Sequence, residues 1–338
     1  MSASEMEGKP MPPRPDAVNL NELLARIAKS AGLALIVGVL ILIFVYGAQG
    51  FTSKFNLFNL TRNLSVAAVV GFGMMVVLAL GHMNLALGST ALASVMIMGW
   101  VMKVAALPVP VAVGCGLAVG SLLGLLNGWL IVKTKLHSFI ITLATASMFL
   151  GLVLIMFPGG PISDLPREFT GISKTRYFGW VSGMLLITLV AGVVLAVMYR
   201  FTTLGRQMLA TGANPDAAEL SGIPVSRAIL LAHTLSGFLA ALAGVMFTAR
   251  QGSALLSTGE DWLLASFLAP LLGGTLLAGG YVSVVGAFLG AMLVGILQNG
   301  LVLIGVPDFW VEFVLGLTLL ITVSLDRLRN VLAARRGN

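Results

Sequence analysis

Long apolar runs, separated by short polar or glycine-containing segments, follow one another along the chain from residue 31 to residue 325. A transmembrane helix needs about 20 mostly apolar residues to cross about 30 Å of hydrocarbon, and the chain has runs that approach this length throughout. The pattern predicts an all-α polytopic membrane protein with about ten transmembrane helices. The predicted spans are 31–50, 64–81, 86–106, 108–132, 137–157, 180–199, 227–250, 262–279, 282–304 and 310–325.

The amino-acid composition agrees with a membrane protein. Hydrophobic residues make up 58% of the 338 residues, charged residues make up 10%, and the mean hydropathy is +1.00. A soluble domain cannot bury that much apolar surface. The single cysteine, Cys115, lies in an apolar run, so neither a disulfide framework nor a thiolate metal cluster is expected within one chain.

Both ends of the chain are polar. Residues 1–18 are rich in proline and charge and lack the features of a secretory signal, which predicts a disordered cytoplasmic tail. Apolar residues at helical spacing from Leu20 to Ile27 then predict a short amphipathic helix on the membrane surface, which completes an N-terminal region of residues 1–30. Residues 326–338 form a basic C-terminal tail.

Lysine and arginine residues are unevenly distributed between the two sides that ten spans define. With the N-terminus inside, thirteen of the twenty basic residues lie on the cytoplasmic side and seven lie outside, which predicts cytoplasmic N- and C-termini. The same topology places the polar segment Leu204–Arg227 in the cytoplasm and the loop Pro158–Gly179 outside. The net charge of +7 does not indicate nucleic-acid binding, because the basic residues lie at the ends of apolar runs rather than on one face.

The segment Leu204–Arg227 is the one long polar stretch in the second half of the chain. Asn214 can cap a helix through its side-chain oxygen, and Pro215 suits the first helical position. Gly222 and Pro224 then end this helix, which predicts about two helical turns. A helix this short is unstable alone in water and cannot cross a membrane, so it requires a surface on which to dock.

Two glycine-rich stretches interrupt the spans. Gly81–Ser89 reads GHMNLALGS and Gly273–Gly280 reads GGTLLAGG, and the turns predicted within them contain no lysine or arginine. We therefore expect broken helices at membrane depth, with irregular backbone that lines a translocation pathway. The alternative is that the glycines only allow helices to pack closely.

Most polar groups within the predicted spans are neutral amides and hydroxyls. Such groups can pass a neutral polyhydroxylated molecule through hydrogen bonds without trapping it, although they can also hold helices together. His82 is either a solute contact or a packed neutral histidine, and packing is the favoured interpretation. The candidate pathway residues are His82, Asn84, Gly88, Asn127, Thr142, Gly273, Gly274, Thr275 and Asn299.

Several motifs are absent from the sequence. It contains no phosphate-binding GxxxxGK[ST] loop, no HExxH, no CxxC and no GxSxG, so we expect neither an enzyme nor a metal site in this chain. Ion-coupled carriers usually carry acidic residues within their spans. Here Glu260, Asp261 and Glu312 lie at the predicted outer ends of spans rather than within them, where they can reach water. A proton- or sodium-coupled transporter of a small polar solute is therefore the alternative function and not the leading one.

The polar segment carries a recognisable motif. Thr202 to Ile223 reads T-x-L-G-x-x-x-x-A-x-G-x-N-x-x-A-A-x-x-S-G-I, which resembles the cytoplasmic coupling segment of the ribose/xylose/galactose-type permease family of bacterial ABC importers. Further stretches similar to this family follow in order along nearly the whole chain after residue 31. They are Gly81–Ser89 (GGIDLSVGS-like), Leu125–Ile131 (LLNGxLI-like), Ser138–Leu143 (PxFIxTL-like) and Leu272–Gly280 (LGGTxxxGG).

The resemblance implies a transmembrane permease subunit in the bacterial inner membrane. Its partners would be a cytoplasmic ABC ATPase, a periplasmic solute-binding protein, a second permease subunit in a homodimer or heterodimer, and membrane lipid. ATP and Mg²⁺ would bind to the ATPase, and no cofactor would bind to this chain. The coupling segment, residues 201–227, would contact the ATPase through Gly205, Arg206, Gly212, Asn214, Asp216, Ala217, Ala218, Glu219, Ser221 and Gly222.

The chain departs from the family pattern in two places. Its first glycine-rich stretch lacks the second glycine, the aspartate and the serine of GGIDLS, which puts specificity for a pentose or hexose in doubt. Ser138 replaces the usual proline before Phe139, and the arginine-glycine pair that often follows shortly afterwards is missing. These changes fit an altered solute or a non-identical partner subunit, and the expected cargo is therefore a sugar or a related polar solute.

Overall fold

A computed structural model describes residues 20–336 of the chain. The predicted disordered tail, residues 1–18, lies outside the described residues. Apart from a β-hairpin of two two-residue strands, the regular structure of the described residues is helical. The elements are α1 Leu20–Gly47, α2 Lys54–Leu78, α3 Leu87–Lys103, α4 Val109–Thr134, α5 Ser138–Met156, α6 Arg167–Lys174, β1 Arg176–Tyr177, β2 Val181–Ser182, α7 Gly183–Phe201, α8 Thr203–Ala213, α9 Pro215–Leu220, α10 Val225–Gln251, α11 Trp262–Leu272, α12 Val284–Leu303 and α13 Asp308–Arg336.

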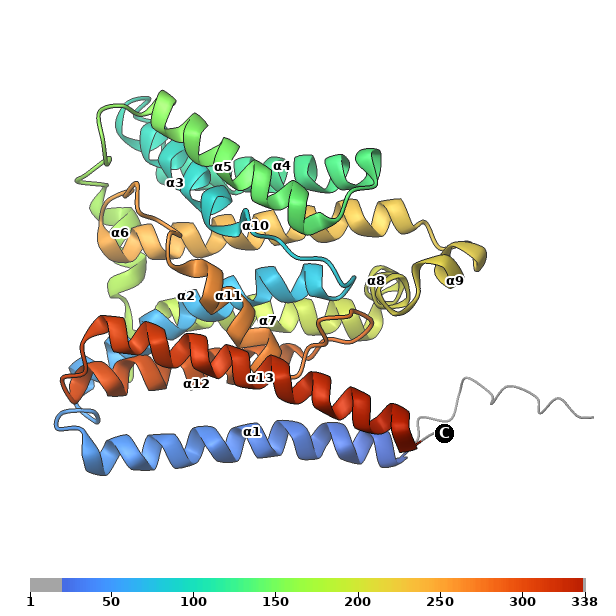
Figure 1. Cartoon of the computed structure of the whole chain (residues 1–338). Coiled ribbons are helices and arrows are strands. Elements are labelled where there is room, and N and C mark those ends of the chain that lie inside the picture. Colours follow the sequence, from blue (N-terminus) through green and yellow to red (C-terminus); the bar gives the residue numbers. More distant parts are fainter. Residues whose placement is uncertain (1–19, 337–338) are drawn as a thin grey trace, which may run out of the picture.

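Each of the ten predicted spans falls on one apolar helix. Within residues 20–336, six helices are long and apolar enough to cross a membrane, namely α2, α4, α5, α7, α10 and α12. Shorter apolar stretches lie in α1, α3, α11 and α13. The long helices run roughly along one direction, with α6 at one end of the bundle and α9 at the other (Figure 1). We refer to these as the α6 end and the α9 end.

Some helix boundaries differ from the sequence-based expectation. The first helix, α1, is continuous from Leu20 to Gly47, so no break separates a surface helix from the first predicted span. The second, α2, begins at Lys54 rather than at residue 64, because the hydroxyl of Ser53 caps it by accepting a hydrogen bond from Asn56 N (3.2 Å). The last helix, α13, continues through the predicted C-terminal tail as far as Arg336.

Among the six long apolar helices, α2 is the most buried. Its apolar residues between Val66 and Leu80 pack against α7, α10 and α11, and Phe72, Met74 and Met75 are fully buried. By contrast, most residues of α4, α5 and α7 are not buried in the single chain. On α4, the side facing α10 is made of small residues, and a Cβ added at Gly124 would lie 2.2 Å from the carbonyl oxygen of His233. Close packing through small residues is a common way for membrane helices to associate.

Two helices, α3 and α11, are short because an irregular segment inside the bundle adjoins each of them. Between α2 and α3 the chain turns back from the α9 end and runs without regular structure before α3 begins (Figure 1). The second short helix, α11, has only 11 residues, and the glycine-rich segment after it forms an irregular hairpin before α12. The helix breaks expected at both glycine-rich stretches are therefore present.

The polar segment forms two helices rather than one. The sequence analysis predicted only α9, whose cap is confirmed, because Asn214 Oδ1 accepts a hydrogen bond from Ala217 N (3.0 Å). The additional helix, α8, begins where Thr202 Oγ1 accepts a hydrogen bond from Gly205 N (3.2 Å). Gly222, with φ +77°, follows α9. At one end of the bundle α8 packs against the other helices and α9 projects, with Leu220 91% exposed (Figure 1).

Candidate functional site

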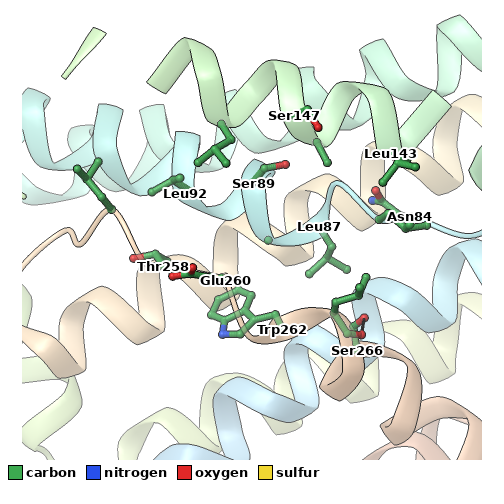
Figure 2. Close-up of a pocket in the computed structure, with 17 residues that line it drawn as sticks. Asn84, Leu87, Ser89, Leu92, Leu143, Ser147, Thr258, Glu260, Trp262 and Ser266 are labelled. Carbon is green, nitrogen blue, oxygen red and sulfur yellow. Dashed lines mark hydrogen bonds between the residues drawn. The ribbon is translucent and has the colours of Figure 1, made fainter. Parts of the chain in front are cut away.

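A cavity of about 370 Å³ lies where α3 and α11 begin, beside α5. Figure 2 shows Leu143 and Ser147 of α5 on one side of this cavity and Thr258, Glu260 and Trp262 on the opposite side. The volume falls in the range of small-molecule sites, which is about 300–1,000 Å³. The lining residues are Asn84, Leu85, Leu87, Gly88, Ser89, Leu92, Leu143, Ala146, Ser147, Leu150, Leu256, Thr258, Gly259, Glu260, Trp262, Leu263 and Ser266. We call this cavity the pocket.

The pocket combines hydroxyl groups with apolar walls. Three of its hydroxyls donate to nearby backbone carbonyl groups: Ser89 to Ala86, Thr258 to Leu255 and Ser266 to Leu263. Their lone pairs remain able to accept hydrogen bonds. Trp262 adds a large aromatic surface, and Glu260 is the one charged residue in the lining. This mixture suits a small polar molecule that presents both hydroxyl groups and apolar faces.

The first turn of α3 faces the same pocket. Its N-cap residue is Ala86, which makes no side-chain capping hydrogen bond. The first N–H groups of an α-helix have no partner within the helix, and the helix dipole makes this end partly positive. Leu87, Gly88 and Ser89, the first residues of α3, line the pocket, and their N–H groups have no partner within the helix.

A close backbone contact fixes the position of this helix start. A Cβ at Gly88 would lie 2.1 Å from the carbonyl oxygen of Gly259, so no side chain fits there. Gly259 has φ +83°, a conformation that glycine adopts without steric cost. The loop before α11 therefore packs directly on the start of α3, and the two together form one wall of the pocket.

Side chains of α5 and the side chain of Asn84 satisfy the irregular backbone before α3, and Ser236 of α10 holds Asn84 in place. Ser138 Oγ accepts from Met83 N (3.0 Å), and Thr142 Oγ1 accepts from Leu85 N (3.1 Å). Asn84 Oδ1 accepts from Ala86 N (3.1 Å), while its Nδ2 donates to Ser236 Oγ (2.9 Å). Irregular backbone within a membrane protein needs such partners, and these bonds show how the segment is held in place.

A substitution at Thr142 tests this support. Thr142→Val keeps the shape but leaves Leu85 N without its acceptor, and an unpaired buried donor costs about 1–3 kcal/mol. We expect a lower thermal unfolding temperature for the detergent-solubilised protein. Thr234→Val is the matched control, because Thr234 Oγ1 bonds only to Leu230 O of its own helix. Equal stability of the two variants would contradict this role for Thr142.

The candidate pathway residues have different positions. Asn84 and Gly88 line the pocket, and Thr142 supports the segment that carries them. His82 lies outside the pocket lining, with its Nδ1 3.3 Å from Nε2 of His233. This is consistent with the favoured interpretation of His82 as a packed residue.

The other candidate pathway residues lie away from the pocket. Asn299 exchanges two 2.9 Å hydrogen bonds with Asn56, which link α12 to α2. Asn127 is buried on α4, and its side-chain amide has no hydrogen-bond partner among the described residues. Gly273, Gly274 and Thr275 lie where α11 ends, whereas the pocket lies where α11 begins.

Sequence reasoning missed several residues of the pocket. Ser147 was hidden in an apolar span, although Leu143, Ser147 and Leu150 have the spacing of one helical face. The sequence analysis considered Glu260 only as a residue at the end of a span, and it did not single out Thr258, Trp262 and Ser266. No sequence signal showed that the loop before α11 packs against α3.

The predicted ATPase contacts fall into two groups. Seven are exposed, namely Arg206, Asn214, Asp216, Ala217, Glu219, Ser221 and Gly222. Gly205, Gly212 and Ala218 are buried. The exposed residues form a surface on and around α9, while Gly205 and Gly212 pack α8 against the bundle.

Comparisons with known proteins agree with the resemblance. Residues 56–323 match the family described as "Branched-chain amino acid transport system / permease component". The ribose import permease protein of Bacillus subtilis (strain 168) is 36% identical over 294 residues, covering 86% of this chain and 91% of that protein. The fructose import permease protein of Rhizobium meliloti is 31% identical over 311 residues, covering 88% and 85%.

A third relative is the ribose import permease protein of Escherichia coli (strain K12), which is 33% identical over 306 residues and covers 86% of this chain and 92% of its own length. No solved structure matches the chain. Together with its six long apolar helices, these matches show that the chain belongs to the family of multi-pass membrane permeases of ABC importers that includes the ribose and fructose permeases.

Proposed function

We propose that this chain is the transmembrane permease subunit of an ATP-driven importer for a sugar or a related polar solute in a bacterial inner membrane. The similarity to ribose and fructose import permeases over most of the chain carries the proposal. The ten apolar helices cross the membrane in this arrangement, both termini lie in the cytoplasm, and the α9 end faces the cytoplasm. The distribution of basic residues supports this orientation.

The α9 helix is the proposed docking element for a separate ATPase subunit. It is capped at Asn214 and stands out from the bundle with Leu220 exposed. A short helix whose ends are capped can move as a rigid unit without unfolding, so it can transmit a displacement of the ATPase to the bundle. ATP and Mg²⁺ bind to the partner, and closure of its nucleotide sites shifts the permease between inward-open and outward-open states.

The pocket is the proposed solute site. Its hydroxyl groups, free helix N–H groups and Trp262 can recognise a neutral polyhydroxylated molecule by hydrogen bonds and apolar contact. A binding protein delivers the solute at the α6 end. A second permease subunit covers the apolar face of α5, from which Leu143 and Ser147 line the pocket.

Uptake by cells that express the permease with its ATPase and binding protein tests the proposed cargo. We expect accumulation of radiolabelled D-ribose, D-fructose or D-xylose, with unlabelled forms of the transported sugar competing. Accumulation should stop when the ATPase is omitted. If the cells took up charged amino acids and no sugar, the assignment to a sugar or a related neutral solute would be contradicted.

Glu260 is the one observation that favours the ion-coupled alternative, because it places a carboxylate in the pocket lining. Glu260→Gln removes its charge while keeping its shape. We expect the variant to change the apparent affinity for the solute. The remaining uptake should depend on ATP and should not change when the proton and sodium gradients are collapsed. Ion-driven uptake that Glu260→Gln abolishes would instead establish the alternative.

A further inference from the structure

Three segments that are distant in sequence meet at the α9 end of the bundle. They are the end of α2 with the turn after it, the last turn of α8, and the glycine hairpin between α11 and α12. We call their meeting point the glycine junction. Its residues are Ala79, Leu80, Gly81, Gly212, Ala213, Ala278, Gly279 and Gly280.

The segments touch backbone to backbone in the glycine junction. Gly280 N donates a hydrogen bond to the carbonyl oxygen of Ala79 (3.0 Å). A Cβ at Gly212 would lie 1.9 Å from that same oxygen and 2.7 Å from Gly280 N. A Cβ at Gly279 would lie 2.6 Å from Gly81 N and 2.8 Å from the carbonyl oxygen of Gly212. These spaces admit no side chain, so the three segments pack as one unit.

Each segment leads directly to a functional part of the chain. Gly212 lies two residues before Asn214, the residue that caps α9. Gly81 begins the irregular segment that continues through Asn84 to the start of α3 in the pocket. The glycine hairpin continues from the end of α11, whose first turn contributes Trp262 to the pocket. One contact thus connects α9 with both short helices that begin at the pocket.

We propose that the glycine junction positions α3 and α11 relative to α9, so that a displacement of α9 reaches both walls of the pocket together. The inference rests on the proposed function, because it requires an ATPase docked on α9. Closely packed backbone transmits displacement, since packed interiors have low compressibility. A side chain wedged into the junction should therefore uncouple the pocket from α9 without altering the exposed face of α9.

A cysteine in the pocket reports on this coupling. The parent protein carries Cys115→Ala and Ser147→Cys and is assembled with its ATPase. The measurement is the rate at which a membrane-impermeant maleimide modifies the new cysteine, with and without ATP plus vanadate. In the parent we expect this rate to change about fivefold or more between the two nucleotide states, a typical size for coupling between sites.

Gly212→Ala in this parent should nearly abolish the nucleotide-dependent change, while the ATPase still co-purifies. Its control is Gly114→Ala, because Gly114 is also helical but has no atom within 4 Å of an added Cβ. Gly280→Ala is a milder wedge, since its Cβ would lie 3.0 Å from Cα and Cβ of Ala213. Gly50→Ala is the control for this variant, with a similar φ of +80° and open space around it.

The results separate the inference from the proposed function. A parent that neither binds the ATPase nor changes its labelling with nucleotide would contradict the proposed function itself. If the labelling rate of the parent changes with nucleotide, and the rates of Gly212→Ala and Gly280→Ala change by the same factor, only the role of the junction is overturned. Loss of ATPase binding in Gly280→Ala would also overturn it, because the junction would then shape α9 rather than transmit its displacement. If Gly212→Ala does not fold, Gly280→Ala and Gly50→Ala test the inference, which requires a smaller nucleotide-dependent change in Gly280→Ala than in Gly50→Ala.

Discussion

Replacing Ala217 with tryptophan is expected to abolish ATP-driven uptake while the protein still inserts into the membrane. Ala217 is exposed on α9, so a large side chain there can point away from the bundle. It would, however, occupy the surface that we propose to dock on the ATPase. The measurement is solute uptake together with the amount of ATPase that co-purifies with the permease, and both should be lost.

Ala105→Trp provides the matched control. Ala105 is also an exposed alanine, but it lies in the loop after α3, away from α9. This variant should keep ATPase binding and uptake. If Ala217→Trp retained both properties as well, α9 would not be the docking element.

Replacing Ser147 with tryptophan should block transport at the pocket. Ser147 lies on the exposed side of α5 and lines the pocket, so the indole can enter the cavity without disturbing the buried core. We expect uptake to fall to that of membranes without the permease, while co-purification of the ATPase is retained. The two measurements together distinguish a blocked pathway from a failure of assembly.

The neighbouring residue on the same helix supplies the control for this experiment. Met148 is 65% exposed and does not line the pocket. Met148→Trp should therefore retain much more uptake than Ser147→Trp at equal expression. Equal uptake by the two variants would show that the pocket is not on the route of the solute.

Local chemistry explains the structural features that the sequence predicted well. Asn214, Pro215 and Gly222 carry strong helix start and stop signals, and α9 begins and ends as they indicate. The glycine-rich stretches lack the basic residues of ordinary cytoplasmic loops, and the helices break there. Both features depend on residues close together in the chain, so one sequence is enough to reveal them. The family resemblance, which rests on the same stretches, is confirmed.

Features that depend on distant parts of the chain were not predictable in the same way. The amides of Asn56 and Asn299 pair across 243 positions, so Asn299 was assigned to the pathway when its partner was unknown. Ser147, Trp262 and Glu260 become neighbours only because the loop before α11 folds onto Gly88. The close approach of Gly212 to Ala79 likewise requires the packing of α8 against the end of α2.

Measuring which energy source drives transport tests the central claim most directly. The chain would be reconstituted into sealed vesicles, either alone or with its ATPase and with binding protein supplied outside, using radiolabelled D-ribose, D-fructose and D-xylose as probes. We predict accumulation of at least one sugar only when ATPase, ATP and binding protein are all present, with no effect of an imposed proton or sodium gradient. Accumulation by the isolated chain, driven by an ion gradient without ATP, would contradict the account.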